Sequence, residues 1–198
     1  LEEKHILVNL KDVKSQKAIE SLGYGGVIIP TKSDYLHINN VNFAGAKSNM
    51  FMKQTVLSTT KPEGDNYLRE VVVEYRNPFP ASNCNEERGT LCLNAPLRNW
   101  VRFYVPKGAK LVKFIGSEME KRSYEESGKQ VFEGFLIVKP LGKASVKVTY
   151  TVPKAAVTTN RYSLLIQKQP GTIEIPTSVT FNGEKQQETV RKDTIFSF

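Results

Sequence analysis

The stretch from Tyr67 to Val152 consists of one strand-like run after another, and this pattern constrains the fold more than any other feature of the sequence. Apolar and polar residues alternate with a period of two in residues 71–76, 101–105 and 144–150, and Asn-Pro, Pro-Lys-Gly and Pro-Leu-Gly turns separate the runs. Alternate side chains of a strand point to opposite faces of its sheet, so each run predicts a strand with one buried face. Many short strands with turns between them predict a mainly β protein, an antiparallel β-sandwich of Ig-like type.

The N-terminal part follows a different pattern. Residues 5–10 and 27–29 are short apolar runs, which we predict to be strands. Residues 13–22 between them predict a helix, with Asp12 as its N-cap and Gly23 as its stop. This strand–helix–strand unit is too small to fold alone, so we expect it to pack on the sandwich.

Length and composition fit this division. The chain has 198 residues, of which 39% are hydrophobic, and this is enough to bury a core. We expect a small α/β unit over residues 1–60 and a β-sandwich domain over residues 61–198. No run approaches the roughly 18–20 apolar residues of a membrane span. The abrupt first and last residues suggest a soluble piece of a longer protein.

Two cysteines, Cys84 and Cys92, bracket a polar loop. A pair that closes a short loop suggests a disulfide, and therefore an oxidising compartment. The chain-entropy model gives such a short closure about 2.5 kcal/mol of stabilisation. Two unpaired thiols in a cytosolic loop are the alternative. Two cysteines cannot make a four-ligand zinc site, and no histidine lies near them in the sequence.

The chain is basic, with a formal net charge of +8. A solvated sheet face with charged strand edges explains such a charge without any ligand. Attraction to an anionic surface, such as a wall polymer or lipid head groups, is the functional alternative. We expect no nucleic-acid partner, because the sequence has no aromatic–basic RNA-binding motif and no helix-turn-helix pattern.

Several segments together resemble a known family. The two most specific segments are Asn42 to Asn49 (Asn-Phe-Ala-Gly-Ala-Lys-Ser-Asn) and Lys168 to Thr172 (Lys-Gln-Pro-Gly-Thr). Other segments of the resemblance lie at 74–77 and 101–111. They resemble the C-terminal part of the bacterial domain-of-unknown-function family four-thousand-twelve, over roughly residues 2–172. The cysteine-bracketed insert at 79–96 departs from that pattern.

Members of that family are envelope proteins, typically with a membrane-spanning helix near the N-terminus. The resemblance implies an extracellular, surface-exposed domain of a membrane-anchored protein. It implies no reaction, because the family has no established activity. The disulfide expected from the cysteines agrees with an exported domain.

The densest polar cluster comprises Asn42, Lys47, Ser48 and Asn49, with Asn39 and Asn40 just before them. Asn and Ser side chains satisfy backbone groups in tight turns, so a structural role explains the cluster. The alternatives are a ligand-facing loop, or a buried Lys47 that forms an isopeptide bond.

Trp100, Arg102 and Tyr104 share one face of a predicted strand. Trp and Tyr offer an apolar face with a polar tip, which suits stacking on a sugar. If this face is open to solvent, it forms an aromatic–basic stripe. If a second sheet covers it, Trp100 belongs to the core.

No catalytic motif is present, so we expect a protein that is not an enzyme and that uses no cofactor or metal. His5 and His37 lie in predicted strands, where a structural role is the usual one. Glutamates between Gly116 and Gly128 could pair for glycoside hydrolysis, but they lie in a charged loop. The expected function is a structural or adhesive module that binds an anionic wall polymer or a glycan, or alternatively a scaffold for another surface protein.

Overall fold

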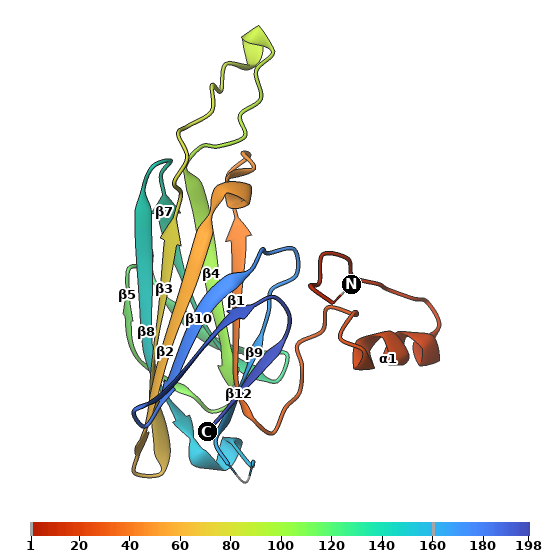
Figure 1. The fold of residues 1–198 in the computed structure, drawn as a ribbon, viewed down its shortest axis with the longest axis vertical. Coiled ribbons are helices and arrows are strands. Elements are labelled where there is room, and N and C mark those ends of the chain that lie inside the picture. The colour runs from red at the N-terminus through yellow and green to blue at the C-terminus, as the bar shows by residue number, and fades with distance from the viewer. Residues whose placement is uncertain (1, 160) are drawn as a thin grey trace.

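The computed structural model describes residues 2–159 and 161–198, and its main body is a sandwich of two six-stranded sheets (Figure 1). In order across the sheet, sheet A contains β12 (Thr194–Ser197), β9 (Ser163–Gln167), β1 (Asp34–Asn42), β4 (Leu97–Pro106), β7 (Lys129–Val138) and β6 (Arg122–Glu126). Sheet B contains β11 (Glu184–Val190), β10 (Ile175–Phe181), β2 (Lys53–Glu63), β3 (Asn66–Arg76), β8 (Lys143–Pro153) and β5 (Lys110–Ile115). The mainly β sandwich predicted from the sequence is confirmed.

Strand direction differs from the prediction. β9 pairs in parallel with β1, and β10 pairs in parallel with β2, while the other pairs are antiparallel. The C-terminal part of the chain thus adds two strands to each sheet, beside the strands that came first. The sheets are therefore mixed, and the Ig-like antiparallel arrangement was wrong. A period of two fixes which side chains face inward, but it carries no information about the direction of the neighbouring strand.

The core lies between the sheets and follows the predicted alternation. Three side chains of β3 point inward and are almost fully buried: Val71, Val73 and Tyr75. The same holds for Val101 and Phe103 of β4. Removing a side chain such as that of Phe103 would cost about 3–5 kcal/mol, because a cavity would remain. The inward apolar side chains of these strands thus hold the two sheets together.

One charged cluster lies inside this core. Arg69 of β3 forms an ion pair with Asp34 of β1, and both side chains are fully buried. The Arg69 guanidinium also donates to Thr60 Oγ1 (2.9 Å), Tyr150 Oη (3.3 Å) and Tyr162 Oη. We call these five residues the Arg69 cluster. Burial opposes the charge and lowers the pKa of Arg69, but the Asp34 carboxylate and the two phenols raise it well above its ordinary value.

The N-terminal segment contains a helix but not the predicted strands. α1 spans Val13–Ser21, and its N-cap Asp12 accepts a hydrogen bond from the Ser15 backbone N–H (2.8 Å). Gly23 follows it with a φ of +79°, a conformation that favours glycine. Residues 5–10 and 27–29 form no strands, so the strand–helix–strand unit was wrong. Short apolar runs do not by themselves establish that a neighbouring strand is available for pairing.

The predicted boundary between residues 60 and 61 falls inside β2. β1 and β2 each lie within a sheet, so residues 34–63 belong to the sandwich. α1 carries no buried residue and stands beside the sandwich (Figure 1). Only the part of the chain before β1 contributes no strand to the sandwich.

A long loop between β3 and β4 projects from one end of the sandwich (Figure 1). It contains the short helix η2 (Glu86–Arg88), and Cys84 and Cys92 form a disulfide across it, as predicted. At its base, Asn77 donates to Asn94 Oδ1 (2.7 Å), and Asn94 donates to the carbonyl of Pro80 (2.7 Å). The two asparagines are buried and replace main-chain pairing where the strands have ended.

Two further short helices lie in loops, η1 (Ser48–Phe51) before β2 and η3 (Lys154–Ala156) after β8. Within the residues that the structure describes, no helix combines the length and hydropathy needed to cross a bilayer.

Candidate functional site

Trp100, Arg102 and Tyr104 lie on the outer face of sheet A, opposite the core residues of the same strand. No second sheet covers this face, so Trp100 is not part of the core between the sheets. The shared strand face predicted from the sequence is therefore present. The solvent exposure of these three side chains differs along the strand.

Trp100 is partly exposed and held in a fixed orientation. Its ring packs against the rings of Phe43 and Phe135, each with a centroid separation of 6.0 Å. Its Nε1 donates to Glu133 Oε2 (3.0 Å), which also accepts from Tyr124 Oη (2.8 Å). Because Phe43 is 66% exposed, an apolar aromatic surface faces solvent here.

Arginines surround these rings. The Arg122 guanidinium lies 6.0 Å from the Trp100 ring centroid, within the range of a cation–π contact. Arg102 donates to Asn39 Oδ1 (2.8 Å) and lies 3.6 Å from Glu126. Arg98 is exposed on the same face, one alternate position before Trp100. We call this surface the aromatic–arginine face; it consists of Phe43, Arg98, Trp100, Arg102, Arg122 and Phe135.

Tyr104 does not belong to that surface. It is buried against Tyr35, Val131 and Leu165, and burial raises its pKa. Arg102 lies over its ring at 5.6 Å. The exposed stripe predicted from the sequence is therefore shorter than expected, because Tyr104 lies among these side chains and Ile28 and Ile29 of the N-terminal segment pack against the same cluster.

The four loop residues predicted as a binding cluster do not form one site. Asn42 donates to the Ala46 carbonyl (2.8 Å) and accepts from the Ala44 backbone N–H (2.9 Å), as a turn residue does. Ser48 is buried, and its hydroxyl bonds both the carbonyl and the N–H of Ala95. Lys47 is exposed, so the hypothesis of a buried Lys47 that forms an isopeptide bond is wrong. Asn42 and Asn49 line a pocket between the sheets, but Lys47 lies along a different hollow.

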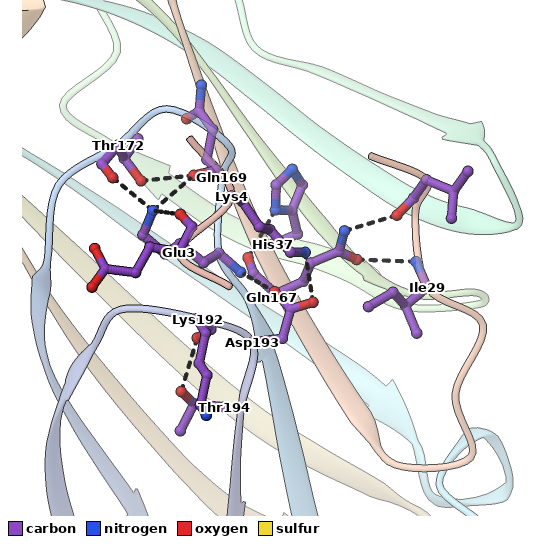
Figure 2. Close-up of polar contacts among 12 residues, drawn as sticks. Glu3, Lys4, Ile29, His37, Gln167, Gln169, Thr172, Lys192, Asp193 and Thr194 are labelled. Carbon is purple, nitrogen blue, oxygen red and sulfur yellow. Dashed lines mark hydrogen bonds and ion pairs between the residues drawn. The ribbon is translucent and has the colours of Figure 1, made fainter. Parts of the chain in front are cut away.

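The two histidines differ in their surroundings: His37 is buried in β1, whereas His5 lies in no strand. His37 Nδ1 donates to the Gln167 carbonyl (2.8 Å), and burial lowers the pKa of its imidazole (Figure 2). His5 is exposed and lies 3.3 Å from Glu3.

Three consecutive side chains, Gln167, Lys168 and Gln169, each hold a different segment, and sequence reasoning assigned them no role. The Gln167 amide donates to the Val27 carbonyl (2.9 Å) and accepts from the Ile29 N–H (3.0 Å), as a strand residue would (Figure 2). It thereby fixes residues 27–29 on the outer face of sheet A.

Lys168 reaches the start of the chain. Its Nζ donates to the carbonyls of Thr172 (2.6 Å) and Glu3 (2.9 Å), and burial lowers its pKa. Asp193 bridges the same segments, since it accepts from the Lys168 N–H (2.9 Å) and pairs with Lys4 Nζ (2.6 Å) (Figure 2). The Lys-Gln-Pro-Gly-Thr segment singled out in the sequence thus joins the N-terminal segment to the sandwich.

Comparison with known proteins yields only distant similarity. No protein-family model matches the chain, and no curated protein matches it. A candidate nutrient-binding protein from Legionella pneumophila has a similar structure, with 8% identity, a TM-score of 0.40, and coverage of 74% of this chain and 53% of that chain. An M1 zinc metallopeptidase from Deinococcus radiodurans is similar with 8% identity, a TM-score of 0.28, and coverage of 74% and 39%. This chain spans about half or less of those chains, and likeness at this level carries no argument about function.

Proposed function

We propose that this chain is an exported, non-catalytic module of a bacterial cell-envelope protein, and that it binds an anionic wall glycan through the aromatic–arginine face. The observation that carries the proposal is the partly exposed Trp100 ring, held between Phe43 and Phe135 on an open sheet face. An aromatic ring stacks on the C–H face of a sugar, and its fixed orientation lowers the entropy lost on binding.

Arginine supplies the charge selectivity. Arg98, Arg102 and Arg122 border the rings, and the chain as a whole carries a net charge of +8. The guanidinium group binds carboxylate and phosphate in a bidentate manner, which suits a charged polymer. Glu126 and Glu133 offset part of this charge, since Glu126 lies 3.6 Å from Arg102 and Glu133 lies 3.9 Å from Arg122.

The disulfide agrees with export, because disulfides persist in oxidising compartments. It also agrees with the resemblance to envelope proteins drawn from the sequence. Extracellular location and membrane anchoring of the longer protein are part of this proposal.

A second candidate function is a scaffold for another surface protein. The projecting loop favours it, because Leu91 (73% exposed), Leu93 and Phe79 present apolar side chains to solvent. Contiguous exposed apolar surface often marks protein contacts, and this alternative requires these side chains to form one. This alternative predicts binding that depends on the loop and not on Trp100.

Co-sedimentation with isolated cell walls across a salt series tests the proposal. We expect binding that weakens as salt rises, and a loss of at least about tenfold in affinity for Trp100→Ala. Arg98→Ala should reduce the salt dependence, and Arg76→Ala on the outer face of sheet B is the matched control. Anionic liposomes run in parallel distinguish a wall polymer from lipid head groups. Wall binding that Trp100→Ala leaves unchanged would refute the proposal.

A further inference from the structure

The core becomes polar at one end of the sandwich. Asn40 of β1, Gln54 of β2 and Asn99 of β4 lie at positions whose neighbours two residues away, Ile38, Val56 and Val101, belong to the core. Amides at inward positions break the pattern that specifies the rest of the fold. Such local conflicts are expected at functional sites, because packing alone would select an apolar residue.

Asn40 is the centre of a hydrogen-bond network. Its Oδ1 accepts from Tyr75 Oη (2.7 Å) and from Asn99 Nδ2 (2.8 Å). Its Nδ2 donates to Gln54 Oε1 (3.2 Å). The network contains side chains from β1, β2, β3 and β4, so both sheets fix its geometry.

Gln169 joins the network through the backbone of Asn40. Its amide donates to the Asn40 carbonyl (2.9 Å) and accepts from the Asn40 N–H (2.7 Å). The pairing of β1 with β9 ends at His37 and Gln167, so this side chain takes the place of the missing strand. The segment that follows, residues 170–175, leads into β10 and forms one wall of a pocket.

The pocket has a volume of about 440 Å³, within the range of about 300–1,000 Å³ typical of small-molecule sites. Part of its lining is apolar: Met50, Met52, Leu97, Ile173 and Ile175. Glu174 is the only charged residue that lines it among the described residues, and its carboxylate pairs with Arg191 (2.5 Å). The pocket therefore suits an uncharged ligand with one apolar face.

Two buried polar atoms of lining residues have no hydrogen-bond partner within the described part of the chain, Asn99 Oδ1 and Gln54 Nε2. Asn99 is only 1% exposed. A buried polar group without a partner is costly, and native structures keep few of them. One of the two atoms is an acceptor and the other a donor, so together they match a ligand group that both donates and accepts.

We propose that this amide pocket binds a neutral saccharide. Sugar hydroxyls donate to Asn99 Oδ1 and accept from Gln54 Nε2, and the C–H face of the sugar packs on the Met and Ile side chains. The site is separate from the aromatic–arginine face and takes a ligand without charge, so it does not depend on the proposed function.

The test is a titration of the intact chain with neutral oligosaccharides. Isothermal titration calorimetry and ligand-observed NMR measure the binding. The probes are an N-acetylglucosamine dimer, a glucose dimer, and a glycerol-phosphate oligomer as the anionic comparison. We expect saturable binding of a neutral dimer, and no dependence on salt, because no charge is recognised. Saturation by the anionic probe alone would overturn the proposal.

Asn99→Leu and Gln54→Leu are the decisive variants. Each removes a hydrogen-bonding group while keeping a neutral side chain of similar size, and each should weaken binding about tenfold or more. Gln187→Leu, at an exposed position of the edge strand β11, is the matched control and should leave this binding unchanged. If both pocket variants fold and bind the dimer as the unaltered chain does, the pocket is not the site. If the unaltered chain binds neither neutral dimer, the assignment of the pocket to saccharides is wrong.

Discussion

Two polar clusters lie between the sheets, and they are built in opposite ways. The Arg69 cluster is charged, and Asp34, Thr60 and two phenols surround the guanidinium. The amide network around Asn40 is neutral and borders a pocket, and it leaves Asn99 Oδ1 and Gln54 Nε2 without partners in the described chain. A polar cluster that is complete within the protein stabilises the fold, whereas an incomplete one beside a pocket is suited to binding.

The largest effect is expected for Arg69→Met. This change leaves the Asp34 carboxylate buried without its partner, so the free energy of unfolding should fall by about 3–5 kcal/mol. Denaturant unfolding followed by circular dichroism measures it. The double variant Arg69→Met/Asp34→Leu should recover part of that loss, because no uncompensated charge remains. A loss below about 1 kcal/mol for the single variant would contradict the structural role of the cluster.

A smaller effect is expected for the pH dependence that His37 contributes. Burial lowers the pKa of His37 in the folded protein below its ordinary value of 6.5, so the unfolded chain binds the proton more readily. Stability should therefore be greatest above pH 6.5 and fall as the pH drops from there toward the folded-state pKa.

Thermal unfolding between pH 8 and pH 5 measures this dependence. His37→Asn should flatten the fall below pH 6.5, while His5→Asn should not, because His5 is exposed. An identical pH profile for the His37 variant and the unaltered chain would show that other groups cause the dependence.

The smallest effect on stability is expected for Asn99→Leu, which tests directly whether the amide network differs from the Arg69 cluster. The variant loses the bond to Asn40 (2.8 Å), but it also removes a buried acceptor without a partner. These terms oppose each other, so the free energy of unfolding should change by less than about 1 kcal/mol. The same denaturation measurement applies, and a loss as large as that of Arg69→Met would make the amide network a structural cluster like the other one.

Much of the sandwich could be predicted from the sequence. The alternation in β3, β4 and β8 identified the inward residues correctly, because burial of one face selects apolar residues at every second position. The helix at residues 13–21 and its Asp12 cap followed from local hydrogen bonding.

The candidate sites could be predicted only in part. The shared face of Trp100 and Arg102 followed from strand parity, but the burial of Tyr104 depends on Tyr35 and Leu165, which are distant in the sequence. Asn40, Gln54 and Asn99 lie far apart in the chain, so no spacing rule could bring them together. Gln167 and Gln169 act through amides that pair with backbone of other segments, and a sequence gives no signal for that.

The sequence by itself determined the secondary structure type of most of the sandwich, the inward face of most of its strands and the short loop that the disulfide closes. These properties depend on neighbours along the chain, within the reach of a turn or one strand. The tertiary structure alone decided that β9 and β10 pair in parallel with the first strands, that Arg69 meets Asp34, and that three amides meet at a pocket. These depend on which strands become neighbours across and between the sheets, and many arrangements of the same alternating pattern bury a similar apolar face.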